Sequence, residues 1–243
     1  MGRPLLLESR LAADLADAEH AIIELNAATP NLLDLEALAR VLLRSEAVAS
    51  SRLEGIVTTP RRLLRFENDQ LEGTVAHRDV DAAEIMGNVA AMQHALSGIA
   101  LKETFGLDDL IDLHTSLLAG TRLSDIAGEI RTKQNWIGGS DFHPCSAAFI
   151  PPPPEELAAL LDDLVDYING DEHSPLLQAG LAHAQFEALH PFADGNGRVC
   201  RVLIHLVLHR LGLAPRYVPP ISLALASKSE AYFAGLNSFS CIA

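Results

Sequence analysis

Chemically reactive side chains crowd one short stretch of this sequence, ALHPFADGNGRVCRVLIHL, at residues 188–206. His190 stands directly before a proline, Asp194 opens a glycine-containing turn, and two arginines follow at positions 198 and 201. An imidazole can accept a proton from a hydroxyl near neutral pH. A single carboxylate can hold Mg²⁺ when phosphates and water supply the other ligands. These residue types indicate a catalyst that acts on a phosphate-containing substrate.

Two helices joined by a tight loop must position these side chains. The apolar run before the loop ends at or near His190, because Pro191 cannot lie inside a continuing helix. Apolar residues recur at helical spacing from Asn196 onward and predict a second helix. The first turn of that helix exposes unpaired N–H groups at the positive end of the helix dipole and is therefore an anion site. Arg198 and Arg201 lie on nearly the same side of it, where they can grip phosphate oxygens.

The base, the metal carboxylate, the amide nest and the arginine pair together describe phosphoryl or nucleotidyl transfer from a nucleoside triphosphate. Each feature alone is ordinary: a histidine before a proline and two arginines three residues apart are common at protein surfaces. The competing interpretation is an acidic loop with incidental arginines. The prediction therefore depends on the combination.

The rest of the chain is mostly helical in its apolar periodicity. Spacings of three and four residues predict a helix from about Asp34 to Glu54, which Gly55 terminates. Further helices are predicted over residues 8–27, 79–97, 107–119, 155–169, 175–190 and 196–211. Two short β-prone patches, one at Trp136 and Ile137 and one at 148–150, predict a β-hairpin at about 135–150. We expect an all-α fold with one β-hairpin.

Composition limits the possible partners and the compartment. The formal net charge of -14 over 243 residues argues against nucleic acid or an anionic membrane as a partner, because neutralising phosphates requires clustered Lys and Arg. The three scattered cysteines, at 145, 200 and 241, fit no zinc spacing and are expected to be reduced. Since the sequence has neither a cleavable leader nor an apolar run of ~18 residues, we expect a cytoplasmic protein without a membrane partner.

The segment HPFADGNGRVCR resembles the signature of the Fic (filamentation induced by cAMP) family, His-x-Phe-x-Asp/Glu-Gly-Asn-Gly-x-x-x-Arg, at every defining position. The segments LIDLHTSLL, AGEIRTKQNWIGG and AAFIPPPPEEL are also similar to those that precede this loop in bacterial members. The resemblance implies a helical Fic core that transfers AMP from ATP to a Ser, Thr or Tyr hydroxyl of a target protein. ATP and the target protein are then the partners, and Mg²⁺ is the cofactor.

The resemblance also implies a role for each residue of the signature. His190 would deprotonate the target hydroxyl, and Asp194 would hold Mg²⁺. Asn196 and the surrounding amides, including those of Gly195 and Gly197, would cradle the α-phosphate region. Arg198 and Arg201 would orient the β- and γ-phosphates. Doc-type relatives, which transfer a terminal phosphate, carry Lys in place of Gly197, so this sequence favours nucleotidyl transfer.

Two further segments acquire roles from the resemblance. In the family, the hairpin at about 135–150 is a flap that docks the target's extended segment by main-chain pairing. Ile137, Gly138 and Gly139 would form part of it, with the glycines permitting close approach. A hairpin that only covers the core is the alternative. Tyr232, in SEAYFAGL, would lie beside the nucleobase or ribose, or it is a core aromatic residue.

Glu54 falls in the last turn of its predicted helix, where the helix dipole disfavours negative charge, so it requires a cationic partner. The segment SSRLEG resembles the family's inhibitory motif, Ser/Thr-x-x-x-Glu-Gly/Asn, with Ser50, Glu54 and Gly55 filling it. The resemblance implies that Glu54 pairs with Arg201, occupies the place of the γ-phosphate and holds the enzyme inactive. A glutamate paired with a nearby arginine at the surface is the alternative.

These expectations divide the chain into an N-terminal helical region at 1–100, which carries the inhibitory helix, and a Fic catalytic core at 101–243. Two other functions remain open on the same residues. One is a phosphodiesterase that removes AMP from a modified protein, and the other is a nucleotide-binding regulator without turnover. Relatives often dimerise, so a homodimer also remains open.

Overall fold

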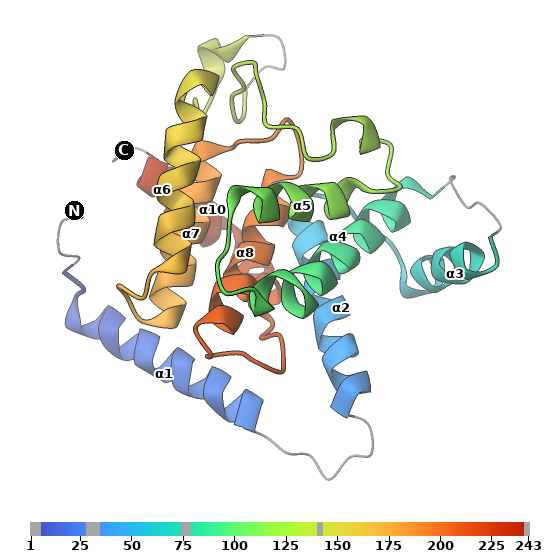
Figure 1. Ribbon diagram of the computed structural model, residues 1–243, viewed down its shortest axis with the longest axis horizontal. Helices are drawn as coiled ribbons and strands as arrows, with labels where there is room; N and C mark the ends of the chain where they lie inside the picture. Colours follow the sequence, from blue (N-terminus) through green and yellow to red (C-terminus); the bar gives the residue numbers. More distant parts are fainter. Residues whose placement is uncertain (1–5, 28–34, 74–78, 140–142, 241–243) are drawn as a thin grey trace.

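A computed structural model, shown in Figure 1, describes residues 6–27, 35–73, 79–139 and 143–240. Its α-helices are α1 (Ser9–Ala27), α2 (Leu35–Leu53), α3 (Pro60–Leu71), α4 (Val80–Ser97), α5 (Leu107–Leu118), α6 (Leu157–Asn169), α7 (Pro175–Leu189), α8 (Asn196–Arg210), α9 (Ile221–Ser227) and α10 (Ser229–Ser240). Short 3-10 turns lie at Ile99–Leu101, Ser124–Ile126, Pro144–Ser146 and Pro154–Glu156. Across the described part of the chain, no helix is both long enough and apolar enough to cross a membrane.

The predicted helices are present, with ends that differ by at most a few residues. α2 stops at Leu53, and Gly55 follows with a φ of 77°, a left-handed conformation that favours glycine. The N–H of Ile56 then bonds back to the carbonyl of Ser51 at 3.1 Å, which closes the helix end. α7 stops at Leu189, directly before His190 and Pro191.

The helix α3 was not predicted from the sequence, although its start carries ordinary signals. Pro60 occupies the first turn, and the Thr59 hydroxyl accepts a hydrogen bond from the Arg62 N–H at 3.3 Å. The helix is short and rich in charged residues, so few apolar positions mark its buried face. Leu63 and Phe66 supply that face and pack with Ile85 of α4.

α8 is the central helix of the molecule. It packs against α7, α4, α5 and α2, and residues 198–208 are all buried. Figure 1 shows these helices gathered around it, with α3 at one extremity of the molecule. One apolar core contains side chains from both sides of residue 100, including Ala47 of α2 and Leu203 of α8. The proposed division at residue 100 stays a prediction.

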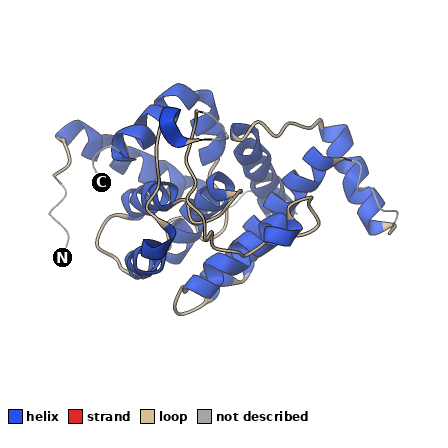
Figure 2. Cartoon of the chain, turned by 90° about the horizontal axis from the view of Figure 1, so that it is seen from above, coloured by secondary structure: helices blue, strands red, loops and turns tan. Residues whose placement is uncertain are grey.

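The fold is mainly helical, as expected, but the predicted β-hairpin at 135–150 is not seen in the described residues. No strand forms among them, as Figure 2 shows, and residues 140–142 lie outside the description. Ile137 and Phe149 form a single antiparallel bridge, in which the Ile137 N–H donates to the Phe149 carbonyl at 2.9 Å. A 3-10 turn at Pro144–Ser146 interrupts the return segment, and its proline has no N–H for a ladder.

Candidate active site

His190 lies at the rim of the predicted loop in an unusual backbone conformation. It is the only non-glycine residue with positive φ in the described part of the chain, at 46°, and such a conformation costs energy. Its N–H donates to the Phe186 carbonyl at 2.9 Å, and its carbonyl accepts a hydrogen bond from Arg131 Nε at 2.9 Å. The side chain is 22% exposed, so the imidazole can reach a bound substrate.

Asn196 closes the loop with its side chain. Its Oδ1 accepts from the Phe192 N–H at 2.9 Å, and its Nδ2 donates to the Phe192 carbonyl at 2.8 Å. The amide side chain therefore faces the loop backbone and holds the turn closed. Phe192 itself is fully buried and stacks on His114, with ring centroids 3.8 Å apart.

His114 of α5 holds the loop from behind. Its Nδ1 accepts a hydrogen bond from the Gly128 N–H at 2.9 Å, and its Nε2 lies 3.1 Å from the Asp194 carbonyl. These partners require a neutral ring with the proton on Nε2, because a proton on Nδ1 would face another N–H. Burial lowers the pKa of His114 to about 4, in agreement with this arrangement.

This pKa shift predicts a loss of stability in acid. The folded pKa of about 4 lies below the unfolded value of 6.5, so the unfolded chain binds the extra proton between these limits. The stabilisation is complete above pH 6.5 and is lost as the pH falls toward 4, by about 3 kcal/mol in all. Urea unfolding at several pH values in magnesium-free buffer should show it.

The matched variants for this measurement are His114→Phe and His20→Ala. His114→Phe keeps a ring on Phe192 but cannot titrate, so the pH dependence of the unfolding free energy between 6.5 and 4 should become shallower. His20 is exposed on α1, and its removal should leave the dependence unchanged. An equally steep dependence in His114→Phe would contradict the assignment.

The start of α8 offers backbone donors without a capping side chain. Gly195, in a left-handed conformation with φ 80°, is the N-cap and supplies no side-chain acceptor for the N–H groups of the first turn. The carboxylate of Glu54 lies directly above this turn, since a Cβ at Gly197 would collide with Glu54 Oε1. A negative group from α2 therefore occupies space at the positive end of α8.

Arg201 gathers several of the predicted residues around one guanidinium group. Its Nη2 donates to Glu54 Oε1 at 2.6 Å and to the Ser50 carbonyl at 3.1 Å, while its Nε donates to Ser50 Oγ at 2.8 Å. Its Nη1 lies 3.4 Å from the hydroxyl of Tyr232. The Tyr232 hydroxyl also lies 3.2 Å from Nε2 of His183 in α7. The chain thus brings α2, α8 and α10 together at Arg201.

Arg198 is equally buried, but its partners are different. Its Nη2 donates to Asp194 Oδ1 at 3.1 Å, and its Nη1 donates to Glu84 Oε2 of α4 at 3.2 Å. Its side chain is only 2% exposed, so the two carboxylates compensate a buried positive charge. The two predicted phosphate-binding arginines are therefore both held by acidic residues in this structure.

Asp194 is the candidate metal ligand. Its side chain is 50% exposed, and only its Oδ1 is paired with Arg198. Within the described residues, no three His, Cys, Asp or Glu side chains gather as a ligand set of their own. A single accessible carboxylate fits Mg²⁺ that takes its other ligands from phosphates and water, and it does not fit a self-contained metal centre.

α2 is attached to α8 a second time, two helical turns before Glu54. Glu46 Oε1 lies 2.9 Å from His205 Nε2 and accepts the Ser222 N–H at 2.7 Å. All three residues are buried. The contact between α2 and α8 is thus enclosed at Glu46, whereas the Glu54 side chain, just after the end of α2, is 39% exposed.

The segment predicted as a flap is tied to the loop at its start. Asn135 Nδ2 donates to the Phe192 carbonyl at 3.3 Å and lies 3.4 Å from the His190 carbonyl. Gly138 and Gly139 both have positive φ, and a Cβ at Gly139 would collide with the carbonyl of Ser146. These two positions therefore require glycine.

Sequence reasoning missed several side chains that build the site. Arg131 is buried and donates to the carbonyls of Leu189, His190 and Pro152. Glu84 supports Arg198, and His114 supports the loop. The contacts just named join residues that lie 21 to 114 positions apart in the sequence, so no local spacing indicated them.

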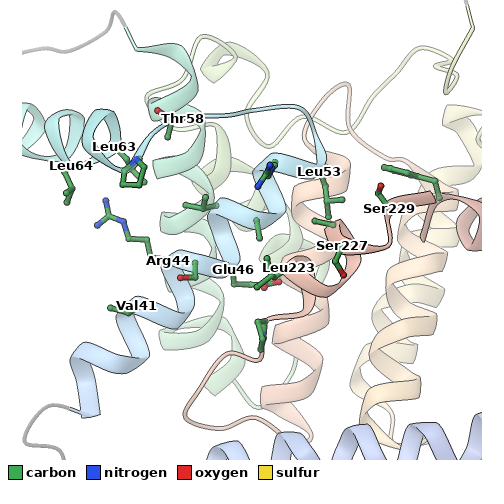
Figure 3. A pocket seen from close by; sticks show the side chains of 18 residues that line it. Val41, Arg44, Glu46, Leu53, Thr58, Leu63, Leu64, Leu223, Ser227 and Ser229 are labelled. Carbon is green, nitrogen blue, oxygen red and sulfur yellow. The ribbon is translucent and has the colours of Figure 1, made fainter. Parts of the chain in front are cut away.

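A cavity of about 1060 Å³ lies elsewhere, between α2, α3, α9 and α10, and Figure 3 shows it from close by. Its described lining includes Val41, Leu63 and Leu223, and none of the predicted site residues belongs to it. The candidate active site is therefore the loop at the start of α8 and not this cavity.

Comparison with known proteins identifies the family of the chain. The model of the Fic/DOC family matches residues 104–208, and the model of the Fic/DOC family N-terminal region matches residues 12–97. Together they cover most of the chain, and the chain belongs to the Fic/DOC family.

Curated relatives carry the name protein adenylyltransferase. The chain is 31% identical over 159 residues to protein adenylyltransferase fic-1 of Caenorhabditis elegans, which covers 63% of this chain and 28% of the relative. It is 32% identical over 139 residues to protein adenylyltransferase Fic of Drosophila melanogaster, covering 56% of this chain and 26% of that protein. The chain thus spans little more than a quarter of the length of these relatives.

Solved structures show the same fold. Fic-1 from C. elegans superposes with a TM-score of 0.74 at 21% identity, over 94% of this chain and 66% of that one. A Fic family protein from Desulfovibrio desulfuricans G20 gives a TM-score of 0.70 at 23% identity, over 97% of this chain and 68% of that one.

Proposed function

We propose that this chain is an autoinhibited protein adenylyltransferase, which transfers AMP from ATP to a Ser, Thr or Tyr hydroxyl of a target protein. The observation that carries the proposal is the combination at the start of α8. An accessible imidazole at His190, an uncapped helix N-terminus and two buried arginines surround one loop. The relatives named protein adenylyltransferase support the same reaction.

The chemistry follows from the positions of these groups. His190 accepts the proton of the target hydroxyl as the hydroxyl oxygen attacks the α-phosphorus. The bond from the α-phosphorus to the bridging oxygen breaks, and pyrophosphate leaves with Arg198 and Arg201 beside its negative charges. The N–H groups at the start of α8 stabilise the charge on the phosphate oxygens.

Asp194 would hold Mg²⁺ through its accessible carboxylate. When bound, the ion would neutralise part of the triphosphate charge. Arg198, which now pairs with Asp194, would then be free to turn toward phosphate oxygens, while Glu84 would keep it in place from the other side.

Autoinhibition is proposed from the contact between Glu54 and Arg201. The Glu54 carboxylate offers Arg201 the same kind of oxygen acceptor as a terminal phosphate, at a distance of 2.6 Å. ATP can engage Arg201 fully only if Glu54 leaves. Ser50, which is buried and bonded to Arg201 twice, would remain as the fixed part of the arginine's surroundings.

Two peripheral roles complete the proposal. The segment that begins at Asn135 and contains Ile137, Gly138 and Gly139 would act as a flap and pair with an extended segment of the target through its main chain. Tyr232, beside Arg201, would border the nucleotide. We keep the cytoplasm as the proposed compartment.

The decisive experiment uses two differently labelled forms of ATP with cell extract and the Glu54→Gly variant. Label from the α-phosphate should appear on protein, and label from the γ-phosphate should not. Transfer of the γ-label alone would identify a phosphotransferase and overturn the proposal. Release of AMP from adenylylated protein by the wild-type chain, lost in Glu54→Gly, would identify the phosphodiesterase, in which Glu54 would position water. Nucleotide binding without either reaction would identify a regulator.

A further inference from the structure

An acidic side chain that the proposed reaction does not use lies directly behind the imidazole of His190. Glu187 belongs to the last turn of α7, and its side chain is 14% exposed. Its Oε2 lies 3.6 Å from His190 Nδ1, slightly longer than an ordinary hydrogen bond. Its Oε1 lies 2.8 Å from the thiol sulfur of Cys200 in α8. The carboxylate thus stands between the imidazole and the central helix.

The surroundings of His190 leave Glu187 as the acceptor that faces Nδ1. The backbone of His190 is held by Phe186 and Arg131, so mainly the side-chain torsions can vary. Nδ1 is buried and has no hydrogen-bond partner at ordinary distance. A buried ring nitrogen that bears a proton requires an acceptor, and the carboxylate of Glu187 is close enough to supply one after a small rotation.

The electrostatics keep Glu187 ionised. Burial alone would raise its pKa, but hydrogen bonding from His190 and Cys200 and the nearby imidazoles of His190 and His183 outweigh burial and lower the pKa to about 2. Burial raises the pKa of the Cys200 thiol, which therefore stays protonated. Its single proton lies between two acceptors, Glu187 Oε1 at 2.8 Å and the Gly197 carbonyl at 2.9 Å. Glu187 Oε1 is thus next to the thiol, and Oε2 is left for the imidazole.

We propose that Glu187 is a positioning residue for His190: it holds the proton of His190 on Nδ1 and so presents the lone pair of Nε2 to the substrate. The hydroxyl proton then moves to Nε2, and the carboxylate stabilises the imidazolium cation that results. The catalytic meaning of this arrangement rests on the proposed adenylyl transfer. The position of the proton on His190 does not depend on that reaction, and it can be measured without turnover.

The test is the tautomer of His190, read from the nitrogen chemical shifts of histidine-labelled protein by NMR. The wild-type chain should carry the proton on Nδ1. In Glu187→Gln the amide oxygen stays with the Cys200 thiol, which turns the amide N–H toward Nδ1 and should move the proton of His190 to Nε2. An unchanged Nδ1–H tautomer in Glu187→Gln would overturn the proposal.

Two further variants serve as controls for the effect of the amide group and for the specificity of the position. Glu187→Leu removes the acceptor without offering a donor, so the preference for Nδ1–H should weaken even if the amide variant folds poorly. Glu103→Gln makes the same change at an exposed glutamate and should leave the tautomer of His190 as in the wild type. If Glu187→Leu retains the full Nδ1–H preference, Glu187 does not position His190.

Kinetics separate this proposal from the proposed function. In the Glu54→Gly background, Glu187→Gln should lower kcat for adenylyl transfer by roughly 10²-fold or more and leave KM for ATP unchanged, because a proton acceptor acts in the transition state. If Glu187→Gln loses transfer but keeps the wild-type tautomer of His190, the role of Glu187 is refuted and the proposed function is not. A shifted tautomer in a protein that never transfers AMP would support the role and refute the function.

Discussion

Glu54→Gly is expected to raise AMP transfer onto protein roughly 5- to 150-fold, the range that energetic coupling between two sites usually spans. The substitution removes the oxygen that Arg201 Nη2 now contacts at 2.6 Å and clears the space above Gly197. The terminal phosphate of ATP can then bind both Arg201 and the N–H groups at the start of α8. The rate of incorporation of label from the α-phosphate of ATP measures the effect.

The fold should lose some stability in this variant, because the Arg201 guanidinium group is only 2% exposed and loses its carboxylate partner. Ser50 keeps Arg201 bonded from α2, which limits the loss. Glu54→Gln retains the size of the side chain and removes its charge, so it should activate less than the glycine. Arg52→Ala, at the exposed neighbouring position, should leave the rate at its basal level. Unchanged rates in both Glu54 variants would contradict autoinhibition.

His190→Ala, made in the activated Glu54→Gly background, is expected to lower adenylyl transfer by roughly 10²- to 10⁴-fold. Removal of the imidazole leaves the hydroxyl of the target with its proton and hence a poor nucleophile. ATP binding, measured by calorimetry, should stay within a few-fold of the parent variant, because the phosphate contacts come from α8. The two measurements together separate a defect in chemistry from a defect in binding.

The matched control for this prediction is His20→Ala in the same background. His20 is exposed on α1 and contacts Glu24, so its loss should alter neither transfer nor ATP affinity. Transfer that survives His190→Ala would remove the imidazole from the reaction. In that case a nucleotide-binding regulator without turnover becomes the better interpretation of the site.

Much of the helical framework was predictable because it depends on local chemistry. Pro191 ends α7 by sterics, Gly55 ends α2 by its left-handed backbone, and the apolar spacing after Asn196 defines α8. These signals act within a few residues and need no knowledge of the tertiary fold. Of the expected hairpin, the described residues show a single bridge between Ile137 and Phe149, and Pro144, which has no N–H to donate, begins a 3-10 turn in the return segment.

The arrangement of side chains around the loop was harder to predict from the sequence. Arg201 meets Ser50 across 151 positions and Glu54 across 147, and the sequence suggested this contact only through a family resemblance. Nothing local indicated that Glu84 would compensate Arg198. Such contacts depend on how helices are packed, which periodicity within one helix does not encode.

The contrast along α2 has a consequence for how the proposed inhibition could be lifted. Glu46 is enclosed with His205 and Ser222, while eight residues later Glu54 meets solvent next to the helix end at Gly55. Fraying of the last turn is therefore much less costly than detachment of the whole helix. Backbone amides near Gly55 should exchange with deuterium long before those near Glu46. A regulator would need only to capture the frayed end, and the core of the molecule would stay intact during each cycle of release and return.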